Sequence, residues 1–182
     1  AAHLCRQMVA YAGKARLDLA AVDLNRLVRD VCGWQWVCTA RNVRTVYELA
    51  EALPGVQADP TQLRYILLYL LTNAEEAIGD KEGVITIRTG AMRCEREYLL
   101  QTHGEDEPAA GQYGFLEIAD TGCGMSAEVK ARLFEPFFTT KFTGRGLGLA
   151  AVHGIVHAHK GAIHVDSEPG RGTTVRVLIP VA

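Results

Sequence analysis

The sequence lacks the features that mark membrane, secreted and nucleic-acid-binding proteins. No apolar run in its 182 residues approaches the roughly 20 residues that a membrane-spanning helix needs. No signal peptide opens the chain, which begins Ala1-Ala2-His3 without an initiating methionine, so we expect a segment of a longer protein. The 19 Lys and Arg residues nearly balance the 21 Asp and Glu residues, and a net charge of −2 gives no general affinity for nucleic-acid phosphates.

The sequence also has no Cys-x-x-Cys pair of the kind found at zinc and redox sites. Its five cysteines are odd in number, and reduced thiols of a cytosolic protein are the simplest interpretation. We therefore predict a cytoplasmic domain, and the sequence leaves open whether the parent chain is anchored in a membrane. His153 and His157 share a predicted helix, but no glutamate lies between them and no third ligand follows, so we interpret them as core-edge or surface residues.

Glycine, by contrast, is over-represented. It accounts for 18 of the 182 residues, above the average usage of about 7%, and nine of the 18 lie between Gly122 and Gly172. The rest of the composition, with 48% hydrophobic and 22% charged residues, is typical of a globular protein. The length predicts one domain with a short appendage. The clustering of glycine therefore needs a local explanation.

Hydrophobic periodicity predicts an α/β protein. We expect helices over about 23–32, from 60 to about 80 and over about 144–160, and strands within 43–51 and over 84–89, 115–119, 162–166 and 173–181. An acidic stretch rich in Gly, Pro and Ala, 103–114, predicts a hairpin loop. Strands mixed with three main helices predict a two-layer α/β sandwich with a mixed, mainly antiparallel sheet.

The clearest helix begins at Asp59, a predicted N-cap, with Pro60 at the first helical position. Its apolar residues recur at helical spacing and predict a buried stripe made of Leu63, Ile66, Leu67, Leu70, Leu71, Ala74 and Ile78. The polar face carries Tyr69, Asn73, Glu76 and Asp80. Asn73 borders the stripe, so its partly buried amide needs a partner. Taken alone, a solvated face or a helix cap explains these residues as well.

The first sixteen residues carry a heptad seam of Leu4, Met8, Tyr11 and Ala15. This pattern is typical of a helix that packs against a partner helix. A helix folded back on the domain's own core would show it too, and two heptads do not separate the interpretations.

Three glycine-containing motifs follow in the second half of the chain. Asp120 ends a predicted strand and precedes Gly122-x-Gly124, which places a carboxylate at a cleft mouth, where it can accept a hydrogen bond from an amine such as adenine N6. Ordinary turns also contain Asp-x-Gly. Gly144-x-Gly146-x-Gly148 opens a helix, and exposed N–H groups there favour phosphate.

Between these two motifs lies an aromatic segment with Phe134, Phe137 and Phe138. It predicts either core packing or a lid that attaches by apolar contact. The third motif, Gly170-x-Gly172-Thr173, closes a turn between the last two strands.

The ordered series of Asn73, Asp120-x-Gly-x-Gly, the Phe-rich segment, Gly-x-Gly-x-Gly and Gly-x-Gly-Thr resembles the catalytic and ATP-binding domain of sensor histidine kinases. That domain belongs to the wider ATPase superfamily of gyrase, Hsp90 and MutL, which has a Bergerat-type ATP-binding fold. The resemblance covers roughly 24–180. It implies ATP and Mg²⁺ as ligands.

The resemblance also implies a role for each motif residue. Asn73 would be the catalytic residue that ligates Mg²⁺, Asp120 would contact the adenine amine, and Thr173 would support Asp120. The remaining nucleotide-binding residues would be Gly122, Gly124, Lys141, Gly144, Arg145, Gly146, Leu147 and Gly148, with Lys141 and Arg145 as phosphate contacts. Phe134, Phe137 and Phe138 match the Phe-rich box of the lid. Glu76 is either an outer-sphere Mg²⁺ partner or a solvated carboxylate.

The implied reaction transfers the ATP γ-phosphate to a histidine on a dimerisation domain, for relay to a response-regulator aspartate. None of the six histidines has the context of that acceptor, so we expect it to be absent from this chain. We expect residues 1–22 to be the end of the dimerisation domain with a linker, and 23–182 to be the catalytic domain. The parent would be a homodimer, and this segment would contact neither nucleic acid nor membrane.

One residue departs from the family pattern. The position one turn before the Mg²⁺ asparagine is commonly asparagine in histidine kinases and a water-activating glutamate in related ATPases, but here it is Tyr69. Tyr69 argues against a dedicated hydrolase. It also motivates an alternative, a nucleotide-sensing interaction module without transfer activity. A serine kinase of the anti-sigma type is a further alternative, which the amino-terminal helix disfavours.

Overall fold

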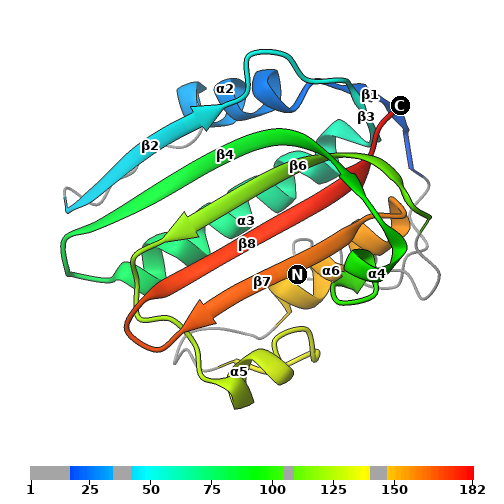
Figure 1. Ribbon diagram of the computed structural model, residues 1–182. Helices are drawn as coiled ribbons and strands as arrows, with labels where there is room; N and C mark the ends of the chain where they lie inside the picture. Colours follow the sequence, from blue (N-terminus) through cyan, green and yellow to red (C-terminus); the bar gives the residue numbers. More distant parts are fainter. Residues whose placement is uncertain (1–16, 35–41, 105–108, 140–146) are drawn as a thin grey trace.

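Six strands form a main sheet that is covered on one face by three helices, and two short strands form a separate pair (Figure 1). The computed structural model describes residues 17–34, 42–104, 109–139 and 147–182. The elements are β1 (Ala20–Val22), α2 (Leu24–Trp34), β2 (Val43–Leu49), β3 (Val56–Ala58), α3 (Pro60–Ile78), β4 (Gly83–Cys94), α4 (Arg96–Leu99), β5 (His103–Gly104), β6 (Gly111–Asp120), α5 (Ala127–Ala131), α6 (Gly148–Ala158), β7 (Ala162–Glu168) and β8 (Gly172–Pro180). Within these ranges no helix is long and apolar enough to cross a membrane.

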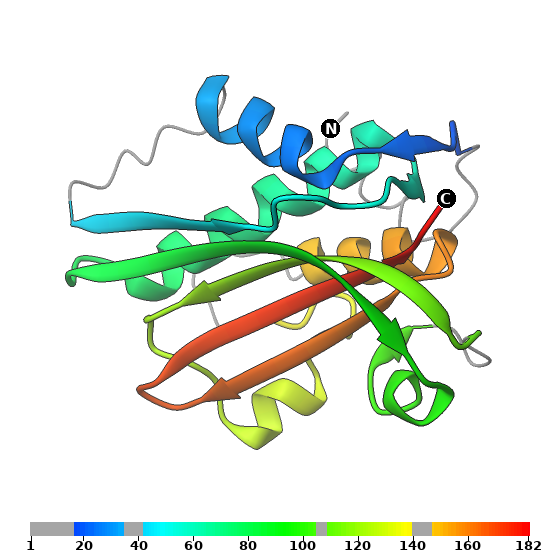
Figure 2. The ribbon, with the colours of Figure 1, turned by 45° about the horizontal axis from the view of Figure 1, so that its top comes forward.

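The main sheet has the strand order β2-β4-β6-β8-β7-β5. β2 and β4 are parallel, and the other neighbours are antiparallel. Helices α2, α3 and α6 lie together on one face of it, where their apolar residues and those of the strands form the main core (Figure 2). The predicted two-layer sandwich with a mixed, mainly antiparallel sheet and three main helices is confirmed.

Helix α3 is the central element of the helical layer. The Asp59 side chain accepts hydrogen bonds from the N–H groups of Thr61 (2.9 Å) and Gln62 (3.3 Å), which caps the helix as predicted. All seven residues of the predicted stripe are buried. The Asp59 N–H donates to Nε2 of buried His159 at 2.9 Å, so the start of α3 is tied to the end of α6.

Several sequence expectations need correction. The 103–114 stretch is not a simple hairpin loop, because β5 pairs with β7 on the far edge of the sheet and β6 already begins at Gly111. The short helix α4 was not predicted, since four residues are too few to show helical periodicity. Its Leu99 packs with Cys94, Tyr113, Ala162 and Leu178 in a second small core. Helix α3 ends at Ile78, so Asp80 does not belong to its polar face.

The amino-terminal heptad seam lies outside the described residues. Strand β1, which precedes the predicted boundary between 22 and 23, pairs with β3. The domain boundary itself stays a prediction.

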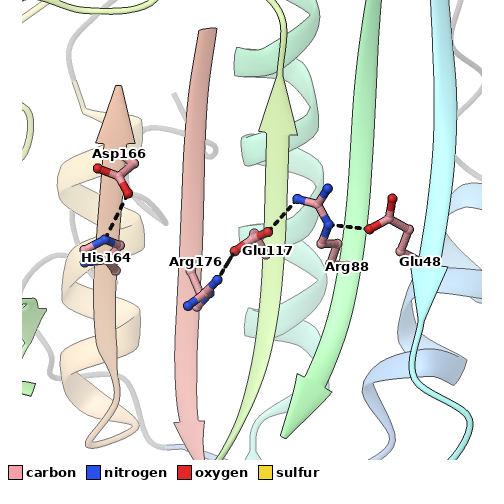
Figure 3. A network of polar contacts seen from close by, with 6 residues as sticks. All are labelled: Glu48, Arg88, Glu117, His164, Asp166 and Arg176. Atoms are coloured by element: carbon pink, nitrogen blue, oxygen red, sulfur yellow. Dashed lines mark hydrogen bonds and ion pairs between the residues drawn. The ribbon is translucent and has the colours of Figure 1, made fainter. Parts of the chain in front are cut away.

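A row of charged side chains crosses the sheet on the face opposite the helices. Figure 3 shows Glu48, Arg88, Glu117 and Arg176 alternating in sign from β2 to β8. Only 4% of the Glu117 side chain is exposed, and its two oxygens lie 2.8 Å from Arg88 Nη1 and 2.6 Å from Arg176 Nη2. Because neighbours in this row face one another in the strand register, the row favours this register over slipped ones.

We predict that Glu117→Ala lowers the free energy of unfolding by about 2 kcal/mol. The loss is smaller than the 3–5 kcal/mol of a fully buried pair, because both arginines reach solvent. Urea unfolding followed by circular dichroism measures it. The matched control is Glu48→Ala, at the exposed end of the row, which should cost less than about 1 kcal/mol. Equal losses in the two variants would contradict this role of Glu117.

Candidate functional site

One face of α3 carries Tyr69, Asn73 and Ala77 on successive turns. Tyr69 and Ala77 are eight residues apart, about 12 Å along the helix axis. Both Tyr69 and Asn73 are half-buried. Each end of this face meets a glycine from elsewhere in the chain, and Asn73 lies between the two contacts.

The Ala77 end contacts the loop that follows β6. The Cys123 N–H donates to the Ala77 carbonyl at 3.0 Å. A Cβ atom at Gly122 would lie 2.6 Å from the carbonyl carbon and oxygen of Ala77, so only glycine allows this approach. The next glycine, Gly124, has a left-handed φ of +65°. The structure therefore gives both predicted glycines a reason, close packing for Gly122 and a left-handed backbone for Gly124.

Asp120 lies at the end of β6, beside this loop. Its Oδ1 accepts a hydrogen bond from the Gly122 N–H at 2.7 Å, which fixes the carboxylate at the turn. On the neighbouring strand β8, Thr173 is the register partner of Asp120. The two residues that the resemblance assigns to adenine are therefore side by side.

Ser167 of β7 connects the loop after β6 to the start of β8 by hydrogen bonds. It is 7% exposed, and its hydroxyl donates to the Gly172 carbonyl at 3.0 Å and accepts from the Met125 N–H at 2.9 Å. The Thr173 hydroxyl lies 2.9 Å away. Since the single proton of Ser167 points to Gly172, Thr173 is the donor in that pair. The sequence analysis missed Ser167, although a polar residue in a strand opposite Thr173 was the available signal.

The Tyr69 end of the face contacts the start of α6. A Cβ atom at Gly148 would overlap the Tyr69 ring. The Tyr69 hydroxyl is hydrogen-bonded to the Asn73 side chain and to the backbone of Leu149. Burial raises the pKa of the Tyr69 phenol, and these two hydrogen bonds act in the opposite direction. The phenol is therefore protonated at neutral pH.

The three phenylalanines of the aromatic segment occupy different environments. Phe134 is half-buried, with ring centroids 4.7 Å from His103 and 5.0 Å from His153. Phe138 packs under the Arg132 guanidinium. Phe137 is 70% exposed and has a left-handed φ of 66°, which is rare for a bulky residue.

The histidines beside Phe134 are packing partners and not phosphate-binding cations. Burial lowers the pKa of His103 and of His153, and neighbouring histidines lower both further. Both imidazoles are therefore neutral at neutral pH. Among the described residues, no group of three or more His, Cys, Asp or Glu side chains is arranged to hold a metal.

The structure thus brings most of the described site residues together around α3. They are Asn73, Asp120, Gly122, Gly124, Gly148 and Thr173, and Leu147 directly precedes α6. Lys141, Gly144, Arg145 and Gly146 lie outside the described residues. Glu76 is exposed, one turn beyond Asn73. The individual roles of these residues stay predictions.

Comparison with known proteins agrees with this arrangement. Residues 58–182 match the family described as histidine kinase-, DNA gyrase B-, and HSP90-like ATPase. The sensor histidine kinase ZraS of Escherichia coli (strain K12) is 38% identical over 168 residues, which cover 91% of this chain and 32% of ZraS. The chain spans about a fifth to a third of the length of the curated relatives that it matches.

Two solved structures are similar over nearly the whole chain. Full-length ShkA in complex with AMPPNP has a TM-score of 0.73 and 28% identity, over 99% of this chain and 35% of ShkA. The histidine kinase ThkA in complex with the response regulator TrrA has a TM-score of 0.72 and 25% identity, over 100% of this chain and 47% of that one. The resemblance read from the sequence is therefore confirmed: the chain belongs to the histidine kinase-, DNA gyrase B- and HSP90-like ATPase family, as an ATP-binding domain of the sensor histidine kinase type.

Proposed function

We propose that this chain binds Mg-ATP and transfers the γ-phosphate to a histidine on a dimerisation domain of the same parent protein. The observation that carries the proposal is the position of Asn73, on the face of α3 between the Asp120 loop and the start of α6. The base end and the phosphate end of a nucleotide would then lie on either side of Asn73. The complex of ShkA with AMPPNP supports this proposal.

Asp120 would recognise the adenine. A carboxylate accepts hydrogen bonds and cannot donate them, so it suits the exocyclic amine of adenine and not the carbonyl of guanine. The Gly122 N–H would hold the carboxylate in place, and Thr173 would support it from β8.

The residues present suit Mg²⁺ that is also ligated by the ATP phosphates. They would not suffice for a metal ion that is ligated by protein side chains alone. Asn73 offers an amide oxygen, and Glu76, one turn away, would be either an outer-sphere partner or a solvated carboxylate. Mg²⁺ is commonly held by one or two protein oxygens together with substrate phosphates. When bound, Mg²⁺ would neutralise phosphate charge. The first-turn N–H groups of α6, with Leu147 and Gly148, would face the same phosphates.

Catalysis would then consist of positioning the ATP γ-phosphate against the acceptor histidine. The bond between the γ-phosphorus and the β,γ-bridging oxygen breaks, a ring nitrogen of the acceptor histidine bonds to phosphorus, and ADP leaves. Tyr69 cannot activate water as a glutamate would, because its phenol is protonated at neutral pH. This feature favours transfer over hydrolysis.

The parent protein would be a homodimeric two-component kinase. Residues 1–22 would belong to the end of the dimerisation domain and its linker, and 23–182 to the catalytic domain. A response-regulator aspartate would be the final acceptor, which the complex of ThkA with TrrA supports. Tyr69 also keeps one alternative open, a nucleotide-sensing module that has lost transfer.

Asp120→Asn should weaken Mg-ATP binding by about tenfold or more, the value of a hydrogen bond to a charged group. Asparagine keeps an oxygen for the Gly122 N–H but loses the charge and one acceptor. Isothermal calorimetry measures the affinity. Asp166→Asn is the matched control, because the Asp166 side chain on β7 is 80% exposed. Equal, saturable binding by wild type and Asp120→Asn would contradict the adenine assignment.

Phosphotransfer in trans should label a separate dimerisation domain that has an intact acceptor histidine. With γ-labelled ATP, we expect acid-labile label on that domain and little on this chain. Asn73→Ala should abolish the labelling. Nucleotide binding without transfer would support the sensing module instead, and acid-stable label on a partner would support a serine kinase.

A further inference from the structure

A row of three polar side chains crosses the sheet at the base end of the proposed site. In the strand register, Asp120 of β6 pairs with Thr173 of β8, which in turn pairs with Ser167 of β7. Because side chains alternate between the two faces of a sheet, each of them shares a face with the residue two positions along its strand. Those residues pack in the main core, and they are Ile118, Val175 and Val165. The row therefore lies on the face that helix α3 covers.

The hydroxyl of Ser167 has its full set of hydrogen-bond partners. A hydroxyl has one proton to donate and two lone pairs that accept. The proton goes to the Gly172 carbonyl at 3.0 Å, because a carbonyl can only accept. The Met125 N–H, 2.9 Å away, can only donate, so it takes one lone pair. The Thr173 hydroxyl, also at 2.9 Å, is left with the second lone pair and must donate to it.

This arrangement determines what Thr173 can offer to a ligand. Its single proton points to Ser167, so its oxygen presents only lone pairs to any other partner. Ser167 is 7% exposed and its three partners are protein groups, so the direction of these bonds does not depend on solvent. Next to Thr173, the Asp120 carboxylate accepts hydrogen bonds and cannot donate them. The two neighbouring side chains therefore present acceptors alone.

We infer that Ser167 is a positioning residue that sets the base specificity, because it holds the Thr173 proton away from the nucleotide. The inference rests on the proposed function, in which Asp120 and Thr173 lie at the adenine. An amine can donate to these acceptors. A carbonyl oxygen in the same place would find no proton, and a buried acceptor without a donor is costly. Ser167 would act only through Thr173, because its own hydroxyl has no further capacity.

The test measures how strongly the chain prefers ATP to ITP, whose base is hypoxanthine and has a carbonyl in place of the adenine amine. The 182-residue chain is titrated with each nucleotide by calorimetry in the presence of Mg²⁺. Ser167→Ala removes the acceptor of the Thr173 proton, so the Thr173 hydroxyl can turn and donate to the carbonyl. We expect the ratio of ATP affinity to ITP affinity to fall about fivefold, as for one hydrogen bond. A purely structural role of Ser167 would change both affinities by the same factor, and an unchanged ratio would overturn the inference.

A second variant tests whether Ser167 acts through Thr173. Thr173→Val has nearly the same shape and lacks the hydroxyl, so the ratio should fall in this variant too. In the Thr173→Val background, Ser167→Ala should lower the ratio no further. A further fall would show that Ser167 acts by another route and would overturn the inference. A wild-type ratio in Thr173→Val would overturn it as well, whether or not Ser167→Ala folds.

Thr174→Val is the matched control, because it is the same substitution at the next residue of β8, whose side chain is on the opposite face of the sheet. It should keep the wild-type ratio, and a fall as large as that in Thr173→Val would contradict the assignment to Thr173. Loss of the preference for ATP in the Ser167 and Thr173 variants would leave the proposed function standing. No ATP binding by the wild type would overturn both.

Discussion

Helix α3 can reach both the loop after β6 and the start of α6 only because the residues that face it there are glycines. Gly122 lies against the Ala77 carbonyl, and Gly148 lies against the Tyr69 ring. Side chains at either position would push the two segments away from the helix. The distance between the Gly122 contact and the Gly148 contact determines how much space lies beside Asn73. Two of the nine glycines between Gly122 and Gly172 therefore shape the site because they have no side chain.

The sequence was sufficient for α3 and for the class of the fold. An N-cap, a proline at the first position and seven apolar residues at helical spacing are local signals, and local physics determines such a helix. The alternating patterns of the long strands likewise predicted the sheet, although β4, β6 and β7 extend further than expected. The family resemblance depended on the order of the motifs, which can also be seen in the sequence without the structure.

The rest depends on contacts between distant residues, which no local pattern carries. Strand β5 is two residues long and is defined by its partner β7. Glu117 reads as an ordinary polar residue of an alternating strand, and only the register shows that it lies between two arginines. Tyr69 was identified as a departure from the family, but its hydrogen bonds to Asn73 and Leu149 need the packed helices.

The account makes the face of α3 with Tyr69, Asn73 and Ala77 the centre of nucleotide binding. Backbone amide shifts of the ¹⁵N-labelled chain, recorded as Mg-AMPPNP is added, test this most directly. The account predicts that the largest shifts lie on both sides of that face, at Asn73, Gly122 and Leu149. Shifts centred instead on the charged row around Glu117, on the opposite face of the sheet, would contradict it.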